Sequence, residues 1–452
     1  MKILSSGSVI RDKHRIGSQA GWVTSKPQTL SLRLASLVSA LLLGIGVLLV
    51  GPVPTAGATS KPTSVTLTPT ADPAHSQTFT WRMTENRSGQ KVQVKAANGK
   101  VTAFSAKYKM RVKKKYAGID SHAFTATATK LKAGTRYSYR IVTSGGSTSW
   151  AAFTTARTGL DRSWTFLAFG DTQVENAGVP QNIIDKAVAK HPSAPLLLHA
   201  GDVVNKPNSI KQWREFMAAT YPTRTTKNWL ISIGNHEQCV LLKKCSSGDA
   251  EAFRSYYTWP RNGVAKQGAT WYYTDYQGVR FIVLDTFSGD IDQQAAFLTK
   301  ALKSNKQRWT VVLQHAGPFA SRSDRNNSKF RKALLPVYNK YKVDLVLSGH
   351  DHSYDRGYYG KNKNSTVYAV SVSGKKFYDA SAKDWKRGGA TRVANAAHTA
   401  TYQTVTVSKK KLTYRAVVGY KGKGSTTKKK VGEVLDQVTI TKNASGKSKT
   451  VR

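Results

Sequence analysis

The stretch VDLVLSGHDHSY (residues 343–354) joins an apolar run to a glycine and two histidines. Four of its first five residues are apolar and predict a buried strand. His350, Asp351 and His352 follow directly after Gly349. A surface loop can carry three titratable side chains in a row without consequence, whereas a metal site requires such groups. The rest of the chain decides between these interpretations, because a metal site needs ligands from other segments as well.

Four other apolar runs of the chain end in the same way. Each run breaks near a small residue, and a metal-capable side chain stands at or just before the break. The runs are WTFLAFGD with Asp171, APLLLHAGD with Asp202, NWLISIGNH with Asn235 and His236, and WTVVLQHAG with His315. A single Gly–Asp pair after a strand is more often a turn or a helix cap. Five such ends favour one shared site, because ligands of open α/β sheets gather outside the carboxyl ends of strands.

Residues 162–440 predict an α/β domain. Apolar strands alternate there with stretches of helical periodicity at residues 179–191, 291–304 and 328–341. Further strand-like runs return beyond residue 364 and are expected to complete a sheet of the same domain. The polar and basic residues 441–452 are expected to form a flexible tail.

Residues 60–157 predict an all-β domain in front of the α/β domain. Short alternating runs are separated by Gly, Asn, Ser and Lys-rich turns, which is typical of a sandwich. Leu131, Tyr137 and Tyr139 stand at positions expected to anchor a fibronectin type III-like sandwich. The domain carries no cluster of chemically reactive residues, so we expect a structural module rather than a positioning domain.

Residues 1–58 have the features of a signal peptide with a long basic first region. An uncharged stretch at residues 34–51 is followed by the small-residue site Ala56-Gly57-Ala58. We expect cleavage and a secreted or cell-surface location, with an uncleaved membrane anchor as the alternative. In an exported chain, the only two cysteines, Cys239 and Cys245, are expected to form one disulfide.

The composition is strongly basic. Lys and Arg number 70 against 25 Asp and Glu, which gives a formal net charge of +45. Such a chain is expected to associate with anionic cell-wall polymers, a membrane surface or phosphorylated substrates. RNA-binding motifs, zinc fingers and basic recognition helices are absent from the sequence, so no specific nucleic-acid partner is predicted. The sequence does not determine the oligomeric state.

The motif order GD, GD, GNH(E), H, GHxH resembles that of the calcineurin-like metallophosphoesterases. The preceding β-sandwich and the GDTQ and GHDHSYDR segments are most similar to bacterial purple acid phosphatase-like proteins. The resemblance implies a four-layer αββα core around two metal ions, each Fe, Mn or Zn. It implies that Asp171 and His352 bind the first metal, that Asp202 bridges both, that Asn235, His315 and His350 bind the second, and that His236 lies unliganded beside the leaving group.

The sequence departs from this family at two positions. Purple acid phosphatases have a tyrosine three residues after the bridging aspartate, where this chain has Asn205, so the resemblance implies no ferric-tyrosinate chromophore. Many relatives have a histidine at the position of Gln173, which is either a weak oxygen ligand or, as we favour, a hydrogen-bonding group behind the ligands. Arg322, Arg325 and Lys329 either extend an anion site or form a solvated face.

The predicted function is that of a secreted phosphatase with a binuclear metal centre that hydrolyses small phosphomonoesters. Attack by a metal-bound hydroxide is expected, with His236 as the general acid. One alternative is a phosphodiesterase or nucleotide pyrophosphohydrolase of the same family. Another is a basic cell-surface protein that binds polyanions and keeps a vestigial site. His350 and His352 are expected to serve different metals.

Overall fold

The computed structural model describes residues 61–117, 119–174, 178–238, 250–263, 270–287, 290–360, 362, 364–446 and 449–452. The predicted signal peptide and the predicted disulfide between Cys239 and Cys245 both lie outside these residues. Within the described ranges, none of the helices has the length and apolar character needed to cross a membrane.

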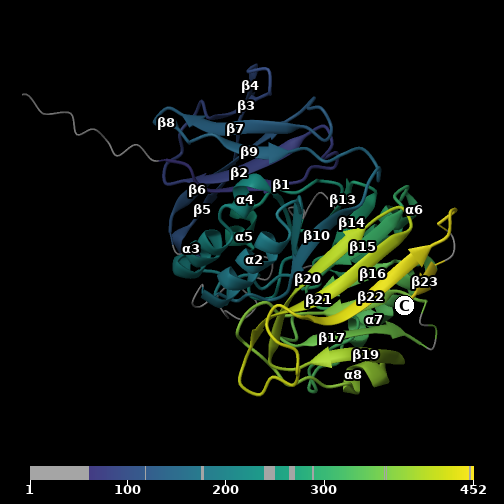
Figure 1. Ribbon diagram of the computed structural model, residues 1–452. Coiled ribbons are helices and arrows are strands. Elements are labelled where there is room, and N and C mark those ends of the chain that lie inside the picture. The colour runs from purple at the N-terminus through teal and green to yellow at the C-terminus, as the bar shows by residue number, and fades with distance from the viewer. Residues whose placement is uncertain are drawn as a thin grey trace, which may run out of the picture. The chain divides into compact units, whose positions relative to one another are not determined.

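The N-terminal domain is a β-sandwich, as predicted (Figure 1). In the described residues its two sheets have the strand orders β1-β2-β6-β5 and β4-β3-β7-β8, with β9 paired to β7. The bounds are β1 (Thr63–Thr68), β2 (Gln77–Met83), β3 (Lys91–Lys95), β4 (Val101–Ser105), β5 (Lys107–Val112), β6 (Ser121–Ala128), β7 (Arg136–Thr143), β8 (Gly146–Ser147) and β9 (Ala151–Thr154). A short helix, α1 (Lys114–Ala117), follows β5.

The sandwich closes around alternate residues of its strands. Phe79 from one sheet packs on Tyr139 from the other, with ring centroids 4.6 Å apart. Leu131 and Tyr137 lie in the same buried cluster. Every second residue of each strand is buried between the two sheets, which explains why alternating apolar and polar residues in the sequence predicted this domain. The specific likeness to fibronectin type III stays a prediction.

The α/β domain is built on two sheets with seven strands each among the described residues. The first has the order β12-β11-β10-β20-β21-β22-β23, and the second β13-β14-β15-β16-β18-β17-β19. The strands of the first sheet are β10 (Trp164–Phe169), β11 (Leu196–His199), β12 (Asn228–Ile231), β20 (Thr399–Val407), β21 (Lys411–Lys421), β22 (Val434–Lys442) and β23 (Lys449–Val451). Those of the second are β13 (Tyr272–Tyr276), β14 (Val279–Val283), β15 (Trp309–Leu313), β16 (Leu345–Ser348), β17 (Tyr354–Tyr359), β18 (Val367–Val370) and β19 (Ala390–Ala396).

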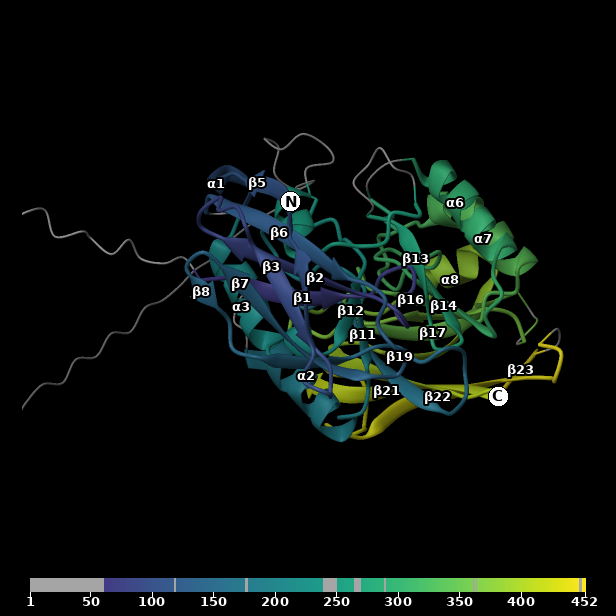
Figure 2. The same cartoon turned by 90° about the horizontal axis from the view of Figure 1, so that it is seen from above.

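Some helices cover these sheets on their outer sides, and others pack against strands of the sandwich. Those described are α2 (Gly178–Lys190), α3 (Ile210–Ala219), α4 (Thr223–Thr226), α5 (Glu251–Tyr256), α6 (Ile291–Lys303), α7 (Ser328–Lys340) and α8 (Lys383–Arg387). Phe281 and Val311 of the second sheet lie in the core shared with the first sheet, whereas Ile282 and Val312 belong to a cluster that includes residues of α6 and α7. Figure 2 shows α6 and α7 side by side on one side of the domain. Helix α2 packs on β20 and β21. This alternation gives the four-layer αββα arrangement that the resemblance implied.

Parallel strands bring the predicted ligands to one end of the two sheets. Strands β10, β11 and β12 are parallel in the first sheet, and β14, β15, β16 and β18 are parallel in the second. Asp171, just beyond β10, forms an isolated parallel bridge with Val372, just beyond β18. The two sheets therefore meet where their carboxyl ends deliver polar side chains.

The C-terminal residues are more ordered than the sequence predicted. Residues 441–452 were expected to be a flexible tail, but they include the end of β22 and the whole of β23, which pairs antiparallel with β22. The side chain of Val451 is buried, and its N–H donates to Asn364 Oδ1 at 2.9 Å. A three-residue strand is too short to show a period in a basic sequence, so tertiary contacts decide its structure.

Candidate metal centre

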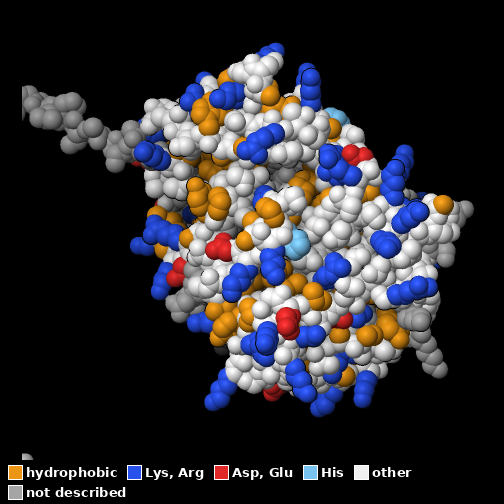
Figure 3. Space-filling model, in the orientation of Figure 1, with side chains coloured by type: hydrophobic (Ala, Val, Ile, Leu, Met, Phe, Trp, Pro, Cys, Tyr) orange, Lys and Arg blue, Asp and Glu red, His pale blue; other side chains and the backbone are white. Residues whose placement is uncertain are grey.

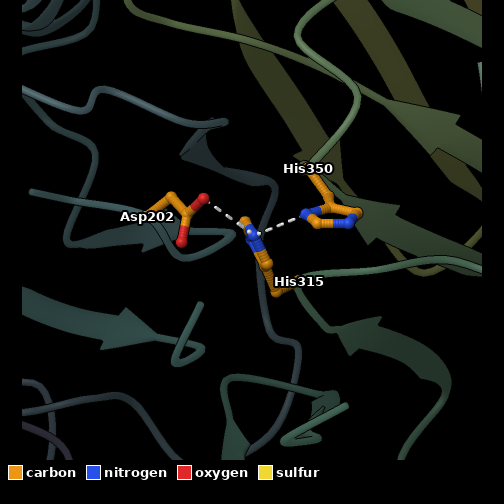
Figure 4. A group of neighbouring side chains, drawn as sticks. All are labelled: Asp202, His315 and His350. Carbon is orange, nitrogen blue, oxygen red and sulfur yellow. Dashed lines mark hydrogen bonds and ion pairs between the residues drawn. The ribbon is translucent and has the colours of Figure 1, made fainter. Parts of the chain in front are cut away.

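The candidate metal centre lies at the carboxyl ends of four strands. Asp171 follows β10, Asp202 follows β11, His315 follows β15, and His350 and His352 follow β16. These side chains form two groups, Asp171–Asp202–His352 and Asp202–His315–His350. Within each group the possible ligand atoms all lie within 4.8 Å of one another. Figure 4 shows the group of Asp202, His315 and His350. Because Asp202 belongs to both groups, it stands where a bridging carboxylate is required.

The contacts divide the two histidines after β16 between the two groups. His352 Nε2 lies 3.2 Å from Asp171 Oδ2, whereas His350 Nδ1 lies 3.2 Å from His315 Nε2. His315 Nε2 also lies 3.1 Å from Asp202 Oδ2. This is the division that the family resemblance implied, while ligation itself stays a prediction.

The backbone explains how residues two apart in sequence reach different groups. His350 and His352 have φ angles of +74° and +53°, and Asp202 has +53°. Non-glycine residues rarely adopt this left-handed region, and such strain gathers at functional sites. The His350 N–H donates to Asp171 Oδ1 at 2.7 Å, a bond that helps to hold this conformation. The strand alternation therefore ends at Gly349, and the two imidazoles diverge.

Two glycines of the recurring motif make room for the carboxylates. A Cβ atom on Gly349 would lie 2.0 Å from Asp171 Oδ1, and one on Gly234 would lie 2.0 Å from Asp202 Oδ1. Both distances are far below van der Waals contact, so any side chain there would push the loop off the carboxylate. Close approach, rather than turn geometry alone, is the reason for glycine at these positions.

Backbone carbonyls orient two of the imidazoles. His315 Nδ1 donates to the carbonyl of Ala200 at 2.7 Å, and His352 Nδ1 donates to that of Lys376 at 2.9 Å. A proton fixed on Nδ1 turns the Nε2 lone pair of the neutral ring toward the carboxylates. This arrangement is typical of histidines that bind metals, because the outer hydrogen bond fixes both tautomer and ring orientation.

The charges of the site demand a cation. Asp171 and Asp202 are each 1% exposed. Burial raises the pKa of Asp171, but the charges of His315 and His352, with the hydrogen bonds from His352 and from the His350 N–H, together lower it below its ordinary value. Burial lowers the pKa of His315, yet Asp202 and Asp171 together raise it to about 9. Buried carboxylates thus hold a proton on His315 where metal ions would supply the positive charge.

The donor set fits such ions. His350 Nδ1 and His315 Nε2 face each other at 3.2 Å, an arrangement that needs a proton or a cation between the two nitrogens. The buried Oε1 of Gln173 has no hydrogen-bond partner in the described part of the chain. Carboxylate and imidazole ligands suit Zn, Fe or Mn. The Nε2 of Gln173 donates to Asp202 Oδ2 at 3.3 Å, which agrees with the favoured role behind the ligands.

Asn235 and His236 lie beside the shared carboxylate. Asn235 Oδ1 is 3.1 Å from His315 Nε2, on the side to which it was assigned. The His236 N–H donates to Asp202 Oδ1 at 3.0 Å, and its Nε2 lies 3.8 Å from Asp202 Oδ2. Its Nδ1 contacts the carbonyl of Asn205 at 2.7 Å. The residue that replaces the family tyrosine thus orients the predicted acid through its backbone.

The sequence interpretation gave no role to Glu237, the residue directly after His236. Glu237 is fully buried, and its carboxylate accepts the N–H groups of Asp202 at 2.9 Å, Val204 at 3.1 Å and Gly234 at 2.8 Å. Burial and then the charge of Asp202 raise its pKa to about 8. Glu237 ties the loops after β11 and β12 together. Its place in the GNHE segment was the one available signal.

The basic residues after His315 have separate places. Arg325 pairs with Asp351 and donates to the carbonyl of His350 at 2.6 Å, so it braces the loop internally. Arg322 lies over the ring of Tyr378, with its Cζ 4.2 Å from the centroid. Lys329 is exposed on α7. Asp351, to which no metal role was assigned, therefore serves as a structural anchor.

The fold has two stacked sheets whose strand ends surround two adjacent clusters of Asp and His side chains, which is the arrangement of a metallophosphoesterase-type fold. Two family models match the chain, "Calcineurin-like phosphoesterase" at residues 165–354 and "Purple acid Phosphatase, N-terminal domain" at residues 62–155. Residues 165–354 therefore form a calcineurin-like phosphoesterase domain, and residues 62–155 in front of it form a domain of the purple acid phosphatase N-terminal type.

The chain spans about half the length of the curated relatives that it matches. The chain is 26% identical over 267 residues to "Probable inactive purple acid phosphatase 27" of Arabidopsis thaliana, covering 51% of this chain and 43% of that protein. It is 26% identical over 258 residues to "Acid phosphatase type 7" of Mus musculus, covering 51% of this chain and 56% of that protein. Among solved structures, purple acid phosphatase PPD1 from yellow lupin (Lupinus luteus) seeds shares the fold, with a TM-score of 0.69 and 18% identity over 86% of this chain and 75% of that one.

Proposed function

We propose that the protein is a metal-dependent phosphatase that hydrolyses small phosphomonoesters at a binuclear metal centre. The observation that carries this proposal is the membership of Asp202 in both ligand groups. The residues would divide between the ions as Asp171, Asp202 and His352 on one side, and Asp202, Asn235, His315 and His350 on the other.

The reaction chemistry divides between the metals and His236. Two bound metal ions, Zn, Fe or Mn, supply an activated water and neutralise charge on the phosphoryl oxygens. His236 lies at the edge of the site, with its Nδ1 held by the carbonyl of Asn205 and its Nε2 directed toward Asp202. The imidazolium form keeps that bond and carries a second proton on Nε2. His236 would donate this proton to the departing alkoxide.

Metal analysis and a substrate panel test this proposal. We expect about two metal ions per purified chain and turnover of p-nitrophenyl phosphate in excess of bis-p-nitrophenyl phosphate. His236→Ala should keep the metal and lose more activity with alkyl phosphates, whose leaving groups need a proton, than with p-nitrophenyl phosphate. Less than one metal per chain together with no turnover under Mn, Zn or Fe would reject the enzyme proposal. Preference for the bis-ester would favour a phosphodiesterase or nucleotide pyrophosphohydrolase instead.

A second candidate is a polyanion-binding protein with a vestigial site. The high positive charge and the similarity to a plant protein named as probably inactive favour it. Lys and Arg side chains far outnumber acidic ones on the face shown in Figure 3. Such a protein would bind anionic wall polymers or anionic vesicles at low salt, and metal loading would produce no turnover.

We also propose export of the chain, on the basis of the charge and apolar pattern of residues 1–58. N-terminal sequencing of the protein recovered from medium and from membranes tests this. A new N-terminus near residue 59 in the medium supports secretion. An intact N-terminus in the membrane fraction supports the anchored alternative.

A further inference from the structure

The two sides of the metal centre have different surroundings. On the His350 side, the ring of Phe287 packs against that of His350 with centroids 4.9 Å apart. On the His352 side, the neighbour is Tyr378, whose ring centroid lies 4.7 Å from that of His352. The Tyr378 N–H also donates to the carbonyl of His352 at 3.3 Å. Any group held at Tyr378 is therefore fixed relative to the candidate ligand His352.

Three cationic side chains surround the ring of Tyr378. Its centroid lies 4.2 Å from Arg322 Cζ, 5.8 Å from Lys376 Nζ and 6.0 Å from Arg325 Cζ. Both faces of a tyrosine attract cations, which accounts for the clustering. Mutual repulsion of three positive charges opposes it. An arrangement of this kind gains stability when an anion lies beside it.

The three cations differ in how far the protein neutralises them. Arg325 is paired with the buried Asp351. Arg322 donates to Asp324 at 2.8 Å, but both side chains are partly exposed, so water screens that pair. Lys376 is exposed, and its ammonium group takes part in no ion pair among the described residues. Arg322 and Lys376 thus leave net positive charge beside the metal centre.

Lys376 lies beside the His352 half of the candidate metal centre. Its backbone carbonyl holds His352 Nδ1 at 2.9 Å. Its ammonium group lies 5.8 Å from the ring centroid of Tyr378, and that ring contacts the imidazole of His352. A substrate whose scissile phosphoryl group occupies the metal centre would extend past the side chains of Tyr378 and Lys376.

We propose that Lys376 and Arg322 form an anion subsite that binds a second phosphate group of the substrate, with Tyr378 holding both cations in place. This inference rests on the proposed phosphatase function and narrows its substrates to phosphomonoesters that carry another phosphate. A guanidinium binds phosphate through paired N–H donors, and an ammonium adds a compact charge. The subsite positions substrate and takes no part in the bond-breaking step.

Kinetics with matched sugar phosphates test the subsite. Wild type, Lys376→Gln, Arg322→Gln and the double variant would be assayed with fructose 1,6-bisphosphate and fructose 6-phosphate. We expect the double variant to raise the ratio of the KM for the bisphosphate to that for the monophosphate about tenfold, and each single variant to raise it roughly threefold. The effect should shrink as salt rises, because the contacts are solvent-exposed. Lys186→Gln, an exposed lysine on α2, is the control and should leave this ratio unchanged.

The outcomes separate the subsite from the proposed function. An unchanged ratio in an active double variant would overturn the subsite and leave the phosphatase proposal intact. Wild type without turnover of any phosphoester would reject the phosphatase proposal. Calorimetric titration of the metal-loaded protein with fructose 1,6-bisphosphate then decides the subsite. Binding that weakens in the double variant supports it, and equal or absent binding in both proteins rejects it.

Discussion

The protein buries charge in two places, and they are built differently. Where the sandwich contacts the α/β domain, the Lys109 ammonium donates to the carbonyl of Arg254 at 2.6 Å and to Thr258 Oγ1 at 3.0 Å. The guanidinium of Arg82 lies over the ring of Tyr256, 4.5 Å from its centroid. Each cation is therefore matched by acceptors or π-electrons that the protein itself provides.

The metal centre has the opposite character. Carboxylates and imidazoles converge there with acceptor atoms facing one another, so the protein does not supply the charge that they require. Burial of an ionisable group therefore does not by itself mark a functional site. What marks the site is the convergence of carboxylates and imidazoles from several strand ends, with the ring nitrogens of His315 and His350 facing each other. Substitutions in the two places should accordingly have different consequences.

Asp202→Asn should have the largest effect, because Asp202 belongs to both ligand groups. An amide oxygen is a poor bridge between two cations, so both ions should be lost or loosened. We expect less than one metal per chain and a fall in kcat/KM of about 10³-fold or more, the order of several kcal/mol that metal ions contribute. Elemental analysis and p-nitrophenyl phosphate turnover measure this. The control is Asp185→Asn, at an exposed carboxylate on α2, and two tightly bound metals in Asp202→Asn would contradict the assignment.

His350→Ala and His352→Ala should separate the two halves of the centre. His352 contacts Asp171, and His350 contacts His315, so each substitution should weaken one metal site more than the other. We expect each variant to bind one ion with near wild-type affinity and the other about 100-fold more weakly, at least as large a loss as outer contacts cause. Metal titration followed by calorimetry resolves the two steps. Identical metal titrations of the two variants would contradict the assignment of His350 and His352 to different metal ions.

Glu237→Gln should have an intermediate effect. The Glu237 carboxylate accepts hydrogen bonds from three backbone N–H groups. In glutamine, the side-chain NH₂ group would face at least one of these N–H groups, and two donors cannot form a hydrogen bond. We expect a loss of about 1–3 kcal/mol in the free energy of unfolding and about a tenfold loss of metal affinity. Thermal unfolding of the metal-free protein and metal titration report these two quantities separately. Wild-type values for both would show that the loops after β11 and β12 hold their positions without this residue.

Much of the fold and most of the site followed from local patterns in the sequence. Period-two strands and helical stretches indicated the sandwich and the α/β domain, because burial on one or both faces leaves its period in the sequence. The ligand candidates Asp171, Asp202, His315, His350 and His352 were found because parallel strands end at one edge. The resemblance, rather than spacing, divided them between two metals.

The rest depended on contacts that leave no local trace. Strand β23 forms because β22 and Asn364 are available to pair with it, and Glu237 acts through backbone groups of two separate loops. Lys376 lies 24 residues beyond His352, and only the folded chain brings its carbonyl to that imidazole. Among the basic residues after His315, the sequence could not distinguish the internal brace Arg325 from the rim residue Arg322.

Lys109→Met should have the smallest effect, and a pH-dependent one, at the other buried charge. Burial, together with the charges of Arg261 and Arg254, lowers the pKa of Lys109 from 10.5 to about 7. Between about pH 7 and 10.5 the unfolded chain therefore binds a proton that the folded chain has released. Stability then rises with pH across this window, by about 1.4 kcal/mol per pH unit at most. Below pH 7 both states are protonated and the contribution is flat.

Methionine fills a similar volume and does not titrate. The thermal midpoint of wild type should therefore rise relative to that of Lys109→Met as pH increases from 7 to 9. Lys107→Met, an exposed position on the same strand β5, is the control and should follow the wild-type profile. Metal content and kcat/KM should stay at wild-type levels in both variants, because this buried charge is matched within the protein. Parallel pH profiles for wild type and Lys109→Met would mean that the carbonyls of Arg254 and Tyr257 keep the ammonium protonated throughout. Loss of metal in Lys109→Met would instead show that the charge at Lys109 and the metal centre are coupled, and would contradict their description as independent sites.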